Sequence, residues 1–205
     1  MTISAPSVGD DEMTGGGEVA AAHPSAGARA LEVLRRGLPD AVLGSEDALG
    51  EVTIRVGRER IVEVSLLLRD HPDARYELPL CVTAVDWPDR EPDAPRFDVV
   101  YQLRSLRHND VARLLVQLTE ADPTVPTLEG VFAGMDWHER ETFDLLGIRF
   151  EGHHDLRRIL LPDDWDGHPL RKDYVSFGEP VAFTHNIEWA LPAQERPRDM
   201  PGQTR

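Results

Sequence analysis

The sequence has 205 residues, enough for one globular domain with tails. Its 22 Lys and Arg against 37 Asp and Glu give a formal net charge of −15, the wrong sign for nucleic acid or anionic lipid. No apolar run approaches the roughly 20 residues that cross a bilayer, and the single cysteine, Cys81, excludes an internal disulfide and an iron–sulfur cluster held by this chain alone.

The first predicted elements follow a segment of small and acidic residues. Residues 1–28 contain almost no large apolar side chain, so we predict a disordered tail. The spacing of apolar residues predicts a short helix over 28–36. Alternating apolar residues predict a strand over 52–56, and the turn at Gly57 predicts that 61–64 returns as the second strand of a hairpin.

The middle of the chain is predicted to add strands to the same sheet. A short helix or turn over 65–71 precedes an apolar segment at 80–87, and the proline-rich stretch that follows is predicted to be a loop. Alternation predicts strands over 97–102 and 112–118, although a helix competes for the second. We therefore expect an α+β domain over 29–123, built on a mostly antiparallel sheet with a few helices.

The strongest local pattern predicts a helix over 137–146. Asp136 is a suitable N-cap, Glu139 stands where a capping-box partner would stand, and Gly147 can take the left-handed position after the last turn. Both Glu139 and Glu141 share helix faces with apolar residues. Because buried carboxylates need partners, we expect them to pair with cations, of which the nearest in sequence are Arg157, Arg158, Arg171 and Lys172.

Two blocks of residues resemble a known family. The first begins on the predicted helix and the second follows it. The residues that carry the match are Glu139, Arg140, Glu141, Asp144, Gly147, Ile148, His153, Leu156, Arg157, Arg158, Ile159 and Leu160, and then Asp166, Gly167, His168, Pro169, Leu170, Arg171, Lys172, Asp173 and Tyr174. This pattern is similar to the thirty-kilodalton-type subunit of respiratory complex I, the proton-translocating NADH:quinone oxidoreductase. His154 stands where many relatives would have proline, which affects only a local turn.

The resemblance implies a non-catalytic subunit of the peripheral arm. It implies contacts with the quinone-site and cluster-bearing subunits, with FMN and iron–sulfur clusters held by those partners and no cofactor in this chain. We therefore expect a hetero-oligomer, held at the cytoplasmic face of the cell membrane through its partners. A homologous subunit of a related membrane-bound hydrogenase or dehydrogenase is the alternative.

We interpret residues 124–178 as the helix plus a partner-docking segment, and 179–205 as an extended or disordered C-terminal arm. Pro169 restricts the preceding backbone to an extended path, which favours an interface for 168–174 over a loop folded on its own domain. We expect the structural or interface residues to be Trp137, Glu139, Arg140, Glu141, Asp144, His153, Arg157, Arg158, His168, Pro169, Arg171, Lys172, Asp173 and Tyr174.

A metal-dependent hydrolase is the enzymatic alternative, because four of the eight histidines lie between His138 and His168. The spacing argues against it. His138 and Glu139 lack the second histidine of an HExxH helix, and His153 and His154 are adjacent. Glu139 and Glu141, two residues apart, point to different sides of a helix and do not form an acid–base pair. We therefore expect no catalytic residue and no metal site.

Overall fold

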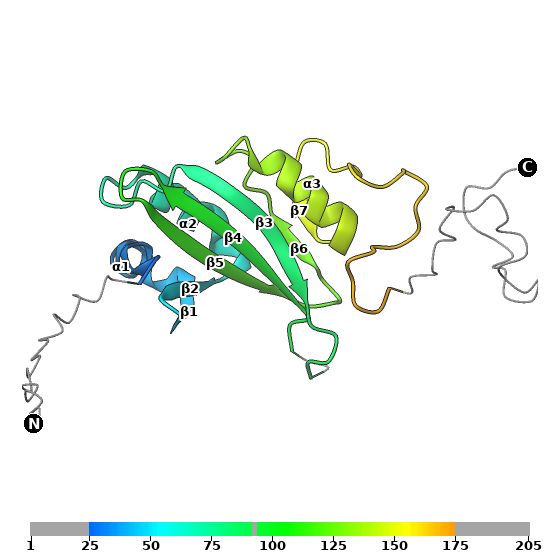
Figure 1. Ribbon diagram of the computed structural model, residues 1–205, viewed down its shortest axis with the longest axis horizontal. Helices are drawn as coiled ribbons and strands as arrows, with labels where there is room; N and C mark the ends of the chain where they lie inside the picture. Colours follow the sequence, from blue (N-terminus) through cyan, green and yellow to red (C-terminus); the bar gives the residue numbers. More distant parts are fainter. Residues whose placement is uncertain (1–24, 92–93, 175–205) are drawn as a thin grey trace, which may run out of the picture.

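The computed structural model describes residues 25–91 and 94–174 (Figure 1). Residues 1–24 of the tail predicted over 1–28, and the arm predicted over 179–205, lie outside the described residues. The prediction of disorder is wrong for the end of that tail, because Ala26 bridges to Glu51 and Ala28 begins α1. The elements in chain order are α1 (Ala28–Gly37), η1 (Pro39–Ala41), β1 (Val42–Ala48), β2 (Glu51–Val56), η2 (Arg58–Arg60), α2 (Ile61–Asp70), β3 (Leu78–Asp86), β4 (Phe97–Ser105), β5 (Asp110–Leu118), β6 (Thr124–Pro126), α3 (Met135–Leu146) and β7 (Arg149–Glu151).

Five strands form the main sheet, in the order β1-β2-β5-β4-β3. Three of its four pairings are antiparallel and one, β2 with β5, is parallel. The predicted strands at 97–102 and 112–118 are β4 and β5, so the alternation identified a strand and not a helix in both places. Together with three α-helices this mixed sheet confirms the predicted α+β class.

The predicted hairpin partner of β2 was wrong. Residues 61–64 begin the helix α2, whose buried residues Ile61, Val64, Ser65 and Leu68 follow a helical repeat. The strand that forms a hairpin with β2 is β1, which precedes it. Leu49 and Gly50 form the turn between them with φ of 55° and 79°, as a tight two-residue hairpin requires.

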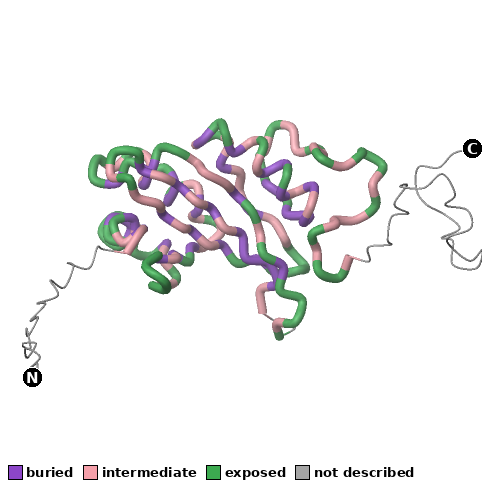
Figure 2. Tube along the Cα trace, in the orientation of Figure 1, coloured by how far each residue is buried: buried purple, intermediate pink, exposed green. Residues whose placement is uncertain are grey.

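One face of the main sheet carries the core. Alternate residues of β4, among them Phe97, Val99 and Tyr101, are buried with residues of α1, α2 and α3 (Figure 2). α1 lies beside β2, whereas α3 lies along β3 at the opposite edge of the sheet (Figure 1). No helix in the described part of the chain combines the length and apolarity that spanning a bilayer requires.

α3 extends over Met135–Leu146 and contains the predicted helix. Its N-cap is Gly134, not Asp136, which lies in the first turn, and no side chain caps the N-terminus. The predicted capping box is therefore wrong. The prediction for Gly147 is confirmed, because this residue ends the helix with a φ of 76° and donates its N–H to the carbonyl of Phe143.

Candidate functional site

Helix α3 positions most of the predicted site residues. It is fastened to the sheet by Thr142, whose hydroxyl lies 3.1 Å from the carbonyl oxygen of Val82 in β3, and by the buried side chains of Met135 and Leu146. Residues 155–174, which we call the wrapping segment, run back past this helix without regular structure (Figure 1). The site is the contact between α3 and the wrapping segment.

Asp144 is the centre of that contact. Its buried carboxylate accepts three consecutive backbone N–H groups, from Ile159 at 3.0 Å, Leu160 at 2.8 Å and Leu161 at 2.9 Å. Arg158 adds a charged bond of 2.7 Å from its guanidinium. Burial alone would raise the pKa of Asp144, but the amides and Arg158 outweigh it and hold the pKa below its usual range. Asp144 is thus an ionised anchor for the wrapping segment.

Arg158 and His168 fix the rest of the segment around the helix end. The second guanidinium nitrogen of Arg158 donates to the carbonyls of Trp165 at 2.9 Å and Gly167 at 3.1 Å. His168 places Nδ1 2.8 Å from the carbonyl oxygen of Asp144. Burial lowers the pKa of His168, and a neutral ring with its proton on Nδ1 satisfies that carbonyl.

Arg140 holds the start of the segment by its backbone. Its guanidinium donates to the carbonyls of Arg157 and Arg158, each at 3.2 Å, and lies over the ring of Trp137, 5.2 Å from the ring centroid. The side chain of Arg157 is exposed and pairs only with Asp155 at 2.9 Å among the described residues. Arg157 therefore contributes through its carbonyl.

The end of the segment is attached to both α3 and the sheet. Arg171 donates from Nε to the carbonyl of Leu146 at 2.7 Å, and the amide of Lys172 donates to Asp86 at 2.8 Å. Asp173 forms an ion pair of 2.9 Å with Arg96. These bonds fold 168–174 onto its own domain, as the competing interpretation of this block expects. Pro169 is half-buried, and Tyr174 donates its amide to the carbonyl of Arg171 at 3.2 Å.

Arg96 and Asp86 form the sheet's side of this attachment. Arg96 is 8 % exposed and makes a two-pronged ion pair with Asp86, at 2.7 Å and 3.0 Å. Burial would raise the pKa of Asp86, but Arg96 and the Lys172 amide lower it below its usual value. Neither residue was predicted from the sequence. A sequence signal for this pair existed: Asp86 and Arg96 flank the predicted proline-rich loop. The strands on either side of that loop, β3 and β4, pair and bring the acid and the base together.

The two glutamates of α3 do not behave as predicted. Glu141 is exposed. Glu139 is fully buried, but it accepts bonds from the Thr127 hydroxyl and, at 2.7 Å, from the Leu128 amide instead of a cation. Burial raises the pKa of Glu139 to about 7, against the lowering effect of these two bonds. Arg158, one of the expected partners, pairs with Asp144.

His153 lies apart from the wrapping segment's anchors. Its side chain is buried, with Nε2 3.3 Å from Asp136 and Nδ1 3.8 Å from Glu129. His154 is exposed, and its pKa is raised by the hydrogen bond to Glu129. The structure thus brings these two histidines to a carboxylate that the sequence analysis did not identify.

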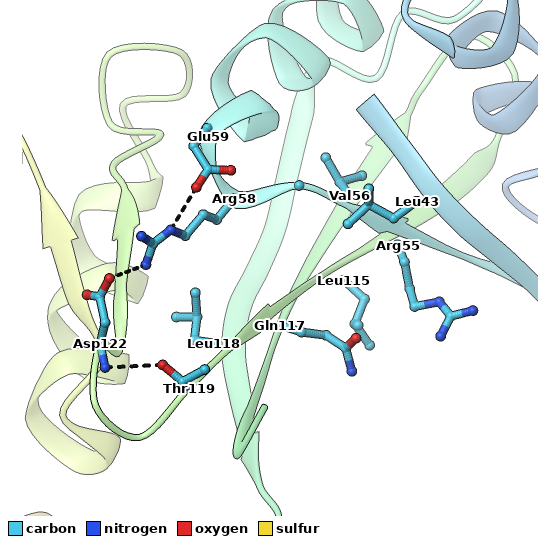
Figure 3. A pocket seen from close by; sticks show the side chains of 11 residues that line it. Leu43, Arg55, Val56, Arg58, Glu59, Leu115, Gln117, Leu118, Thr119 and Asp122 are labelled. Carbon is cyan, nitrogen blue, oxygen red and sulfur yellow. Dashed lines mark hydrogen bonds and ion pairs between the residues drawn. The ribbon is translucent and has the colours of Figure 1, made fainter. Parts of the chain in front are cut away.

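A separate hollow of about 520 Å³ lies between β1, β2 and β5 (Figure 3). Arg58 lines this hollow and donates hydrogen bonds to Asp122 and Glu59. Leu115 and Gln117 of β5 line it as well. It shares no residue with α3 or the wrapping segment. None of the predicted site residues lines it.

Comparison with known proteins assigns the family. The model of the family described as "Respiratory-chain NADH dehydrogenase, 30 Kd subunit" matches residues 54–180, more than half of the chain. The chain belongs to this family. The resemblance read from the two sequence blocks is therefore confirmed, and the chain is a subunit of a respiratory NADH dehydrogenase.

Several bacterial relatives in the 30-kDa family are themselves named as subunits of NADH-quinone oxidoreductase. The protein of Roseiflexus sp. (strain RS-1) is 48% identical over 159 residues, covering 78% of this chain and 90% of the relative. That of Mycolicibacterium gilvum is 48% identical over 147 residues, covering 71% of this chain and 63% of the longer relative.

Two solved structures share the fold of this chain. A trypsin-resistant fragment of Nqo5 matches with a TM-score of 0.52 and 29% identity, over 62% of this chain and 99% of the fragment. A chain of the membrane-bound sulfane sulfur reductase, described as an archaeal respiratory membrane complex, matches with a TM-score of 0.56 over 83% of this chain and 95% of that chain. Its 20% identity shows a common fold alone.

Proposed function

We propose that this subunit is a non-catalytic docking piece of the peripheral arm of NADH:quinone oxidoreductase. Its wrapping segment and α3 contact the quinone-site and cluster-bearing subunits. The chain holds no flavin, iron–sulfur cluster or nicotinamide, and its partners carry those groups. Through them the chain is held at the cytoplasmic face of the cell membrane as part of a hetero-oligomer.

One observation carries this proposal. The bonds described above hold the wrapping segment to α3 and the sheet, whereas large apolar side chains of the segment and of α3 are exposed: Leu160 is 61% exposed, Leu170 53% and, on α3, Trp137 59%. The Asp144 bonds to the amides of Leu160 and its two neighbours fix the backbone that presents Leu160. Exposed apolar residues on a rigid segment indicate a contact with another protein.

The charge of the chain supports a protein partner. Arginine accounts for all but one of the 22 basic residues, and Lys172 is the only lysine. Arginine makes planar, two-pronged contacts that suit protein interfaces better than a flexible ammonium group does. The sequence has one cysteine and no phosphate-binding loop, so it has neither the thiolates of an iron–sulfur cluster nor a nucleotide-binding motif. This is consistent with a docking role for a member of this family.

The test compares two leucines of nearly equal exposure. Leu160 belongs to the wrapping segment, whereas Leu106, 59% exposed, lies between β4 and β5. We expect Leu160→Asp to reduce the other oxidoreductase subunits that co-purify with the tagged full-length chain from membranes, and Leu106→Asp to leave them unchanged. Equal recovery with both variants, or a wild-type chain that purifies without such subunits, would overturn the proposal.

A further inference from the structure

A second cluster of side chains lies where β6 and β7 end. These strands pair in parallel, Pro126 opposite Glu151, and the amide of Thr127 donates to the carbonyl of Glu151 at 2.9 Å. The loop after β6 and the loop after β7 therefore leave the small sheet side by side. The first carries Glu129, and the second carries His153 and His154.

The geometry places one carboxylate against two imidazoles. Glu129 lies 2.6 Å from Nδ1 of His154 and 3.8 Å from Nδ1 of His153. The two rings are nearly parallel, with an interplanar angle of 10° and centroids 5.4 Å apart. One donor atom from each of the three residues lies within 4.8 Å of the other two. The three donors thus converge on one point near the surface.

The buried histidine is oriented as a ligand would be. The amide of Asp155 donates to Nδ1 of His153 at 3.1 Å, so this nitrogen carries a lone pair and a neutral ring has its proton on Nε2. Nε2 lies 3.4 Å from the backbone carbonyl oxygen of Asp136, its hydrogen-bond partner, and 3.3 Å from a buried carboxylate oxygen of Asp136 that has no hydrogen bond within the described part of the chain. A carbonyl or carboxylate oxygen behind the far nitrogen of a histidine is the usual support of a metal ligand.

We propose that Glu129, His153 and His154 bind one divalent cation of the zinc class. Two imidazole nitrogens and a carboxylate suit zinc, whereas magnesium and calcium prefer oxygen ligands alone. Tetrahedral bonds of about 2 Å place donor atoms about 3.3 Å apart, so the 3.8 Å pair must close by about half an ångström and the 2.6 Å pair must open by about 0.7 Å. The Asp155 amide must also release Nδ1 of His153. Exposed His154 leaves the fourth position to water.

The bound cation has a structural role. It links the loop after β7 to the loop before α3, and the second loop also bonds the buried carboxylate of Glu139 through Leu128. Helical HExxH spacing does not detect such a site, because Glu129 is 24 residues before His153 in the sequence. This inference is independent of the proposed docking function.

The test is zinc binding to the metal-free full-length chain, measured by isothermal titration calorimetry. We expect one zinc ion per chain and a rise in the melting temperature when zinc is added. Glu129→Gln and His154→Ala should each weaken zinc binding at least roughly tenfold, because each removes one of only three protein ligands. The visible spectrum of the cobalt(II)-loaded chain should lose its tetrahedral bands in both variants.

His71→Ala is the matched control, because the His71 ring accepts the nearby Asp73 amide and lies outside the cluster. It should bind zinc as the wild type does. The melting temperature of each metal-free variant checks folding, and exposed His154 can be removed without opening the core. A wild-type chain that binds no zinc, or zinc affinity unchanged in both Glu129→Gln and His154→Ala, would overturn the proposal.

Discussion

Two buried carboxylates on α3, five residues apart, are stabilised to very different degrees. Asp144 accepts three backbone amides and a guanidinium, and its pKa is lowered. Glu139 accepts one amide and one hydroxyl, and burial raises its pKa to about 7. Each donor offsets part of the desolvation penalty of the ionised form, so the number and charge of the donors decide the sign. Of these two carboxylates, Asp144 is therefore held ionised, whereas Glu139 titrates near neutral pH.

Glu139 makes the folded chain less stable as the pH rises. Its pKa of about 7 in the folded chain lies above the ordinary 4.5, so between these values the folded chain keeps a proton that the unfolded chain has lost. The free energy of unfolding then falls with rising pH, by about 3 kcal/mol once the pH exceeds 7. We expect Glu139→Gln to flatten this dependence when chemical denaturation is followed from pH 5 to pH 8.

Glutamine suits the site because its carbonyl can accept the Leu128 amide while its NH₂ donates to the Thr127 hydroxyl oxygen. Glu141→Gln is the control, since Glu141 lies on the same helix but is exposed. It should leave the pH dependence unchanged. A Glu139→Gln chain that retains the wild-type slope would show that another group causes it.

At the scale of elements, a long repeat of apolar residues was enough to predict a helix or a strand correctly, whereas a short repeat was not. α3, β4 and β5 each present at least nine residues of consistent pattern, and all three were predicted. The first turn of α2 was misread because Ile61, Val62 and Val64 are β-branched, although Ile61, Val64 and Leu68 share a helical face. The helix or turn predicted over 65–71 lies on the remainder of α2. β6 and β7, with three residues each, carry too few apolar positions to define a period.

The end of α3 depends on the absence of a side chain. Gly147 has a φ of 76°, and a Cβ added there would lie 2.5 Å from the Arg171 guanidinium and 2.6 Å from the His168 ring. A side chain at this position would therefore have to displace Arg171 and His168 of the wrapping segment. Gly50 has nearly the same φ, 79°, but nothing lies within 4 Å of a Cβ added to it.

These two glycines separate backbone strain from crowding. Gly50→Ala should cost only the left-handed conformation, about 1–2 kcal/mol of unfolding free energy. We expect Gly147→Ala to cost more, and to speed hydrogen exchange of the amides of Ile159, Leu160 and Leu161, because displacing Arg171 and His168 loosens the wrapping segment. Equal losses of stability and unchanged exchange at these amides would contradict the role given to the contact.

At the scale of the whole molecule, the site joins parts of the chain that local patterns do not relate. The contacts around Asp144 span up to 24 residues, and the sequence identified most of their members. The bond from the Lys172 amide to Asp86 spans 86 residues, and its geometry depends on the pairing of β3 with β4. Sequence patterns did not reveal Asp86, Arg96 and Glu129, because only the folded sheets bring these residues to their partners.

Arg96 couples the wrapping segment to the sheet, and its loss should affect assembly before catalysis. Arg96→Met leaves Asp86 buried without its cation, at a cost of about 3–5 kcal/mol, and removes the ion pair with Asp173. We expect less assembled oxidoreductase in membranes, with unchanged quinone reduction per assembled complex. The control is Arg113→Met, because Arg113 of β5 pairs with Glu51 of β2, no bond joins this pair to the wrapping segment within the described residues, and both side chains are partly exposed, a setting worth about 1 kcal/mol or less. Normal abundance of the Arg96→Met complex with reduced turnover would mean that the wrapping segment acts on electron transfer and not on docking.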